Sequence, residues 1–172
     1  MDSLDPFQWD TPVTKDFASP EFQIWLSELV EWSENVHALT RAQGANTSDD
    51  YGNTETAIEW ASPTLSEAPV TVSGTEITIN ETGVYKFTVT LRTDNNNRTE
   101  LFVRTYVNTV EQTASVASNY VARDTDQNTG AVTLTDALSL EEGDVVEFRG
   151  EGDCDGTCTG LANGTILLIE RV

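Results

Sequence analysis

The amino-acid sequence predicts a mainly β protein: a β-sandwich or jelly roll preceded by an extended arm and one short amphipathic helix. From Val70 onward the chain is a series of short runs rich in β-branched and aromatic residues, and polar turn sequences separate these runs. Seven or eight such strands in a segment of about 100 residues are typical of a sandwich or jelly roll. Helical patterns do not alternate with the strands, which disfavours a parallel α/β sheet.

The first 18 residues indicate an extended arm. They are acidic and show no hydrophobic periodicity, yet they include Phe7, Trp9 and Phe17. Aromatic side chains in so short a polar segment need a surface on which to be buried. That surface is either the following helix or a partner protein, and we favour the partner.

A short amphipathic helix is predicted over residues 19–44. Ser19 is a suitable N-cap, Pro20 suits the first helical position, and Gly44 is a suitable stop. Apolar residues recur at the spacing of a heptad seam, namely Phe22, Trp25, Leu29, Trp32, Val36 and Leu39. A helix this short is marginal alone in water, so the seam either self-associates or packs against its own domain or a partner.

Polar residues dominate 45–69, and this composition indicates a linker between the helix and a globular domain. The predicted organisation is therefore an N-terminal anchoring arm and helix over 1–44, a polar linker over 45–69, and the β-domain over 70–172.

Period-two alternation predicts which side chains form the core. In the run VYKFTVTL, Tyr85, Phe87, Val89 and Leu91 share one face of a strand, and Lys86, Thr88 and Thr90 point the other way. In LSLEEGDVVEF, the tripeptide 142–144 predicts a turn between two strands. Gly143 tolerates a positive φ, and the Asp144 carboxylate can accept backbone N–H groups. Residues expected to meet on the core face beyond that turn are Leu138, Leu140, Val146 and Phe148.

The formal net charge of −20, from 29 acidic and 9 basic residues, argues against nucleic acids and anionic membranes as partners, because both require a basic surface. No run approaches the roughly 18 apolar residues of a membrane span. The N-terminus MDSLDPFQWD lacks the basic and apolar regions of a Sec-type signal peptide. We therefore expect a protein made in a cytoplasm, with no membrane insertion.

The order of the predicted strands resembles the C1q/TNF-like jelly-roll family over about residues 70–172. ITINETGVYKFTVTL resembles the early strands of that family, with Gly83, Tyr85 and Phe87 at the matching positions. LFVRTYVNTVEQT is similar to the next strand, with Asn108 at the turn but without the glycine that often follows it. LSLEEGDVVEFRG and TILLIERV resemble the late hairpin and the closing strand. The resemblance implies a trimeric jelly roll.

The N-terminal segment is similar to those of many phage tail-fibre and virion-appendage proteins. DPFQWDTPVTKDFASPEFQIWLSELVE carries a Pro-Val motif at Pro12 and Val13, followed by Pro20 and Phe22 at the start of a short helix. The resemblance implies a homotrimer attached to other virion proteins by its N-terminus, with the β-domain outward. The residues expected to form the virion anchor are Phe7, Trp9, Phe17, Phe22, Trp25, Leu29 and Trp32.

Three functions remain open within these expectations. A tail fibre that binds a host surface glycan or receptor comes first, and a capsid decoration or head-fibre protein is the close alternative. A free carbohydrate-binding module is the third. Loops near 94–98, 124–130 and 153–158 would form the contact surface.

Candidate chemistry is sparse. Cys154 and Cys158 form a C-x-x-x-C pair that predicts a small loop disulfide, with two free thiols or metal chemistry as alternatives. Asp124, Asp126 and Asn128 alternate as Ca²⁺ ligands often do, although we favour a simple polar turn at these positions. Apart from this Ca²⁺ option, no cofactor is expected. The only histidine, His37, lies on the predicted helix, and no pair of carboxylates stands out for acid–base work. We expect no enzymatic activity.

Overall fold

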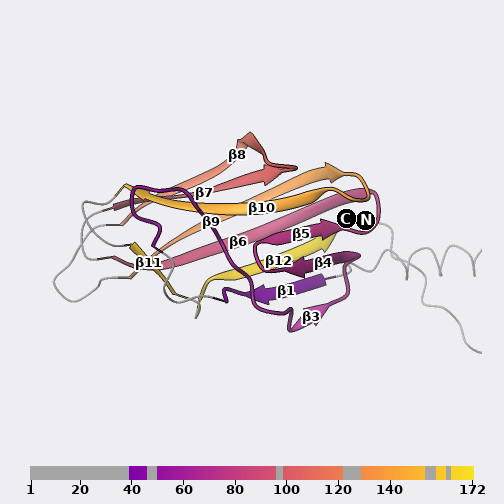
Figure 1. Cartoon of the computed structure of the whole chain (residues 1–172), viewed down its shortest axis with the longest axis horizontal. Coiled ribbons are helices and arrows are strands. Elements are labelled where there is room, and N and C mark those ends of the chain that lie inside the picture. The colour runs from indigo at the N-terminus through magenta and orange to yellow at the C-terminus, as the bar shows by residue number, and fades with distance from the viewer. Residues whose placement is uncertain (1–38, 46–49, 96–98, 122–128, 154–157, 162–163) are drawn as a thin grey trace, which may run out of the picture. The chain divides into compact units, whose positions relative to one another are not determined.

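The computed structural model describes residues 39–45, 50–95, 99–121, 129–153, 158–161 and 164–172 (Figure 1). These residues belong to one compact unit, His37–Val172. Every regular element among them is a β-strand. No helix in these ranges is long and apolar enough to cross a membrane.

The strands form two antiparallel sheets that pack as a sandwich (Figure 1). In the first sheet the order is β11-β6-β12-β1-β3, and β9 pairs with β6 along the length of β6. In the second sheet the order is β4-β5-β10-β7-β8, and β2 pairs with β10. The first sheet contains β1 (Leu39–Gln43), β3 (Leu65–Ser66), β6 (Gly83–Asn95), β9 (Thr129–Leu140), β11 (Cys158–Gly160) and β12 (Ile166–Arg171). The second contains β2 (Thr56–Ala57), β4 (Val70–Ser73), β5 (Glu76–Ile79), β7 (Thr99–Val107), β8 (Val110–Val121) and β10 (Val145–Asp153).

The core lies between the sheets, and the predicted alternation of β6 is confirmed. Its side chains at positions 85, 87, 89 and 91 are all buried, whereas the side chain of Lys86 is exposed. The rings of Phe87 from the first sheet and Phe148 from the second lie 5.5 Å apart between their centroids. Leu140 and Val146 are buried in the same core, and Leu138 packs against it. Burial of such side chains is the main force that holds the two sheets together.

The tripeptide 142–144 forms the predicted turn between β9 and β10. Gly143 has a φ of +92°, a conformation that glycine adopts without steric cost. The Asp144 carboxylate accepts the backbone N–H of Glu141 at 2.8 Å and the side-chain amide of Asn108 at 2.8 Å. Because Asn108 lies in the turn between β7 and β8, its bond to Asp144 holds the two turns together.

The predicted helix over 19–44 is wrong at its C-terminal end, because Leu39–Gln43 form strand β1. This strand pairs antiparallel with β12 in the register Leu39↔Glu170 and with β3 on its other side. Its inward side chains, Thr40 and Ala42, are fully buried. Leucine, arginine, alanine and glutamine all favour helices, but pairing between two strands of a sheet overrides that local preference.

The predicted linker over 45–69 belongs to the β-domain. Four of its apolar residues, Tyr51, Ile58, Trp60 and Ala68, are between 1 and 5% exposed and form part of the hydrophobic core. Residues 50–52 connect the two sheets, since Asp50 bridges to Thr159 and Gly52 bridges to Gly152. The domain therefore begins well before residue 70, and the polar composition of this segment reflects its outer surface.

The two ends of the sandwich differ in what they carry. At one end, which we call the proximal end, Leu39 begins β1 beside Glu170, and the Val172 N–H bonds to the Val84 carbonyl at 2.9 Å. β6 runs from there to the opposite, distal end, where its last residue Asn95 pairs with Cys158. Leu39 and Val172 thus lie at the same end of the sandwich.

Candidate functional site

The outer face of the first sheet carries a compact set of uncharged side chains, which we call the threonine face. Cα pairing places two rows side by side across β9, β6 and β12. Their inward neighbours are core residues, so the members of these rows point away from the core. The threonine face consists of Thr133, Thr90 and Ile166 in one row and Thr135, Thr88 and Leu168 in the next.

The threonine hydroxyls of this face pair with each other. The Oγ1 atoms of Thr90 and Thr133 lie 3.0 Å apart, and those of Thr88 and Thr135 lie 3.4 Å apart. A hydroxyl that already has a partner can be covered by another surface at less cost than an unpaired one. The β-branched methyl groups add apolar contact area, so this face is suited to burial against a protein surface.

The threonine face contains no charged residue, although the chain has 29 acidic and 9 basic residues. Charges begin at its borders: on β1 Arg41 pairs with Leu168, and in the adjacent row the Lys86 Nζ lies 2.8 Å from Glu170 Oε2. Two copies of a chain with a net charge of −20 repel each other, and the repulsion is smallest where neither copy presents a carboxylate. The threonine face is such a region.

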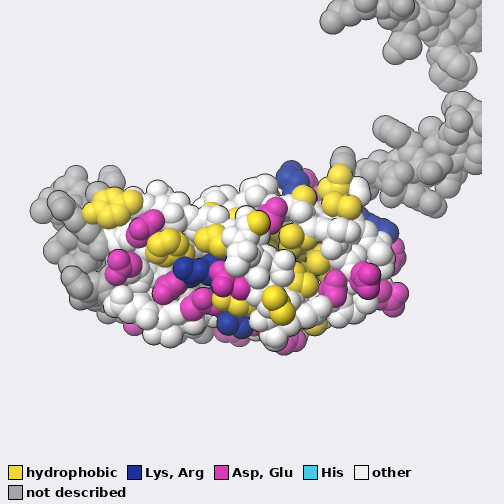
Figure 2. All heavy atoms as spheres, turned by 90° about the horizontal axis from the view of Figure 1, so that it is seen from above, with side chains coloured by type: hydrophobic (Ala, Val, Ile, Leu, Met, Phe, Trp, Pro, Cys, Tyr) yellow, Lys and Arg dark blue, Asp and Glu magenta, His cyan; other side chains and the backbone are white. Residues whose placement is uncertain are grey.

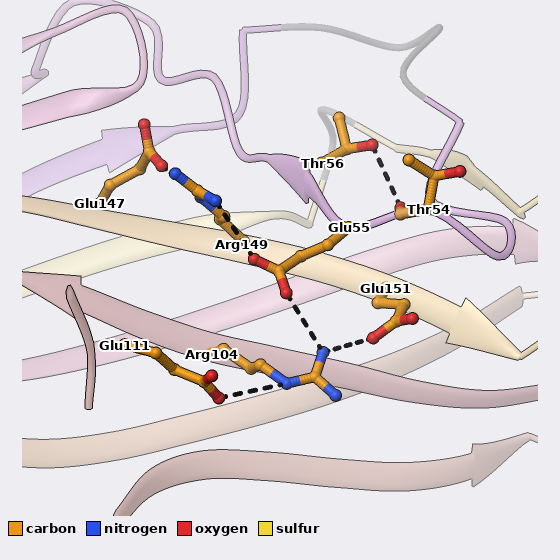
Figure 3. Close-up of polar contacts among 8 residues, drawn as sticks. All are labelled: Thr54, Glu55, Thr56, Arg104, Glu111, Glu147, Arg149 and Glu151. Atoms are coloured by element: carbon orange, nitrogen blue, oxygen red, sulfur yellow. Dashed lines mark hydrogen bonds and ion pairs between the residues drawn. The ribbon is translucent and has the colours of Figure 1, made fainter. Parts of the chain in front are cut away.

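The second sheet presents the opposite chemistry on its outer face, where two arginines lie among four glutamates (Figure 3). We call these six residues the arginine–glutamate network: Glu55, Arg104, Glu111, Glu147, Arg149 and Glu151. Arg104 donates to Glu151 and lies 3.6 Å from Glu111, measured from Nε to Oε1. Arg149 donates to Glu147.

Glu55 connects the two halves of this network. Its carboxylate oxygens lie 3.8 Å from Arg104 Nη1 and 3.4 Å from Arg149 Nη1 (Figure 3). Because Glu55 precedes β2, these contacts fasten residues 50–57 to the outer face of β7 and β10. The partners are 20 to 38% exposed, so each ion pair contributes at most about 1 kcal/mol to stability.

The network shifts the pKa of nearby groups. A hydrogen bond to Glu55, together with burial, raises the pKa of Tyr106 to about 12. Burial lowers the pKa of Arg104, but its hydrogen bond to Glu151 and the surrounding carboxylates raise that pKa overall. The hydrogen bond to Glu147 likewise raises the pKa of Arg149. Both guanidinium groups are therefore charged throughout the physiological range.

The strand ends that flank the three predicted outward loops meet at the distal end. Asp94 pairs with Thr129, Asn95 pairs with Cys158, and Asp153 pairs with Glu100. The strand ends that flank the loops near 94–98, 124–130 and 153–158 thus lie beside one another, opposite the proximal end at which Leu39 begins β1 (Figure 1).

Several predicted site residues fall outside the described residues. Cys158 is fully buried and disulfide-bonded, but Cys154 lies outside those ranges, so their pairing stays a prediction. The proposed Ca²⁺ ligands Asp124, Asp126 and Asn128 also lie outside them. No group of three or more potential metal ligands occurs in the part of the chain that the structure describes. The virion-anchoring residues likewise lie outside the described residues: Phe7, Trp9, Phe17, Phe22, Trp25, Leu29 and Trp32.

Sequence reasoning missed both outer faces as functional surfaces. A signal for the threonine face was present, because the Thr-x-Thr sequences at 88–90 and 133–135 alternate with core residues. What the sequence does not show is that β6 and β9 are neighbours in this register. The arginine–glutamate network had no comparable signal, since its members come from four separate segments.

No protein-family model matches the chain, and no curated protein matches it. Solved structures do. Crystal structures of murine APRIL at pH 5.0 and at pH 8.5 match with TM-scores of 0.59 and 0.58 at sequence identities of 14% and 15%. Each match covers 79% of this chain and 99% of the APRIL chain. APRIL is a TNF-family protein, so the predicted C1q/TNF-like jelly-roll fold is confirmed, and the likeness is one of fold.

Proposed function

We propose that this chain is a non-enzymatic structural protein that assembles as a homotrimer through its threonine face. The observation that carries the proposal is an uncharged face with paired hydroxyls on a chain of net charge −20. The TNF-family-like fold supports it, because the C1q/TNF-like resemblance implies a trimer.

In such a trimer each protomer presents its threonine face toward the three-fold axis, against its neighbours. A cyclic arrangement places the same end of every protomer on the same side of the assembly. The three proximal ends, at which residue 39 enters the domain, then lie together. The three distal ends lie together on the other side.

The two ends of the domain suit different roles, with attachment at the proximal end and contact with a host surface at the distal end. We propose that the protein is a component of a phage virion, made in the host cytoplasm. Its N-terminal segment would bind other virion proteins, and the β-domain would project outward as part of a tail fibre that contacts a host glycan or receptor. The support is the resemblance of residues 5–31 to virion-appendage proteins, together with the separation of Leu39 from the distal loops.

A capsid decoration or head-fibre protein is the second candidate, and the high negative charge favours it. Immunogold labelling of purified particles with an antibody to the β-domain separates the two. Label at the tail supports the tail fibre, and label over the capsid supports the decoration protein. A monomeric chain that binds glycans on an array, with no label on any particle, would instead indicate a free carbohydrate-binding module.

The solution mass of the full chain, measured by light scattering after size-exclusion chromatography, tests the assembly itself. A trimer has three times the 18.8-kDa mass of the chain. A monomer at micromolar concentration would overturn the proposed self-assembly.

A further inference from the structure

Two guanidinium groups on the outer face of the second sheet are held in the same way, each by an aromatic ring and a carboxylate. The Arg104 Cζ lies 5.1 Å from the centroid of the Phe102 ring, and the side chain donates to Glu151. The Arg149 Cζ lies 4.1 Å from the centroid of the Tyr106 ring. These distances are in the range of cation–π attraction. This sheet face therefore binds guanidinium groups of its own chain by ring and carboxylate together.

A third ring–carboxylate set lies on the same face toward the distal end, and it holds no cation among the described residues. Cα pairing places Tyr120, Glu100 and Asp153 in one row across β8, β7 and β10. We call these three residues the Tyr120 row. Tyr120 is 60% exposed. In the described part of the chain, none of the three side chains has a hydrogen-bond or ion-pair partner.

The Tyr120 row is electrostatically unfavourable as it stands. Glu100 and Asp153 are directly opposite each other on adjacent strands, where two like charges destabilise a sheet. A positive charge between them would remove that repulsion. Figure 2 shows the wider setting, in which acidic side chains surround the few basic ones and apolar side chains reach the surface between them.

We propose that the Tyr120 row binds an arginine side chain presented by a basic surface of a partner protein. Charge complementarity supports this occupant, because the chain carries a net charge of −20 and the row adds two carboxylates that have no counter-charge among the described residues. The planar guanidinium can stack on the exposed ring while its N–H groups bond the carboxylates. Ca²⁺ and Mg²⁺ are less suited, since they require six or more oxygen ligands and gain nothing from the ring.

This inference goes beyond the proposed assembly. The threonine face and the Tyr120 row lie on opposite sheets, so a trimer built on the first leaves the second accessible. A trimer would present three such sites at its distal side, and a partner with several arginines would gain affinity by binding them together.

The test is a titration of the ¹⁵N-labelled full chain with the peptide acetyl-Gly-Arg-Gly-amide, followed by NMR. The matched probe is the same peptide with citrulline, which keeps the shape of arginine but lacks its charge. We expect saturable shifts of the Tyr120 amide with arginine and binding at least about fivefold weaker with citrulline. Equal binding of the two peptides would overturn the proposal.

Variants locate the site. Tyr120→Ser and Glu100→Gln should each weaken arginine binding by about two- to fivefold, because each removes one exposed cation contact. Glu142→Gln removes the same charge at the proximal turn and should leave binding unchanged. Unchanged affinity in both site variants, or Ca²⁺ that shifts the same signals and displaces the peptide, would refute an arginine site. The titration reports on this site whether the chain is a trimer or a monomer, so the two proposals fail separately.

Discussion

Gly160→Ala would show how tightly Tyr51 closes the distal part of the sandwich. A Cβ at residue 160 would lie 2.6 Å from the Tyr51 Cε2 atom, closer than two non-bonded carbon atoms can approach. Tyr51 is 3% exposed, so its ring has no free space into which to move. Adding a methyl group to a closely packed core costs about 1–3 kcal/mol of unfolding free energy. We expect Gly160→Ala to lower the free energy of unfolding by that amount.

The double variant with Tyr51→Ala makes this prediction specific. The three atoms nearest to the added Cβ all belong to Tyr51, so removal of the ring leaves the methyl group without a clash. Tyr51→Ala alone should cost about 3–5 kcal/mol, as truncation of a buried aromatic residue does. In that background Gly160→Ala should cost almost nothing, or stabilise by up to about 1 kcal/mol because alanine restricts the unfolded chain.

Equilibrium unfolding in urea, followed by circular dichroism, measures the four free energies of this cycle. The coupling between the two positions should be about 1–3 kcal/mol. Full additivity, with Gly160→Ala equally costly in both backgrounds, would refute the packing of Tyr51 against Gly160. It would also remove the reason to assign residues 45–69 to the domain core at this point.

Three further outcomes follow from turns and titrating groups. Thr109 has a φ of +69°, a strained conformation for a β-branched residue. Thr109→Gly should therefore raise the free energy of unfolding, measured in urea, by up to about 1 kcal/mol. An unchanged free energy of unfolding would contradict the strain. A backbone N–H and the Asn108 amide lower the pKa of Asp144. The Asp144 carboxylate therefore stabilises the fold at pH values above its unfolded pKa near 3.9. This stabilisation is lost as the pH falls through the lower pKa of the folded state. The difference in unfolding free energy between the wild type and Asp144→Asn should therefore shrink below about pH 4. A difference that stayed constant with pH would argue against this linkage. Ultraviolet titration should show Tyr106 ionising near pH 12, and Glu55→Gln should lower that pKa; an unchanged value would exclude the hydrogen bond as its main cause.

Alternation along single strands made much of the fold predictable. The core positions of β6 and the turn at 142–144 follow from local patterns, because a strand buried on one face repeats every second residue and a turn needs particular residues. The segment that became β1 could not be predicted in this way. Its inward residues, Thr40 and Ala42, are small and give no hydrophobic signal, and only pairing with β12 makes them a strand.

Non-local contacts account for the remaining differences. Tyr51 and Ile58 lie in a polar segment, and both are buried beside strands distant in sequence: the Tyr51 N–H bonds to the Cys158 carbonyl and the Ile58 N–H to the Phe148 carbonyl. The same is true of the candidate sites. Thr-x-Thr sequences are visible in the chain, but their meaning depends on the register of β6 against β9, and Glu55 meets Arg104 only after the domain has folded.

The most direct test of the threonine face is the solution mass of Thr133→Glu beside that of Ser118→Glu. Both residues are exposed on the outer face of their sheets, and both variants add one negative charge, but only the first places it on the threonine face. We expect Ser118→Glu to keep three times the chain mass and Thr133→Glu to be a folded monomer by light scattering and circular dichroism. A trimer of unchanged stability in Thr133→Glu would contradict assembly through this face.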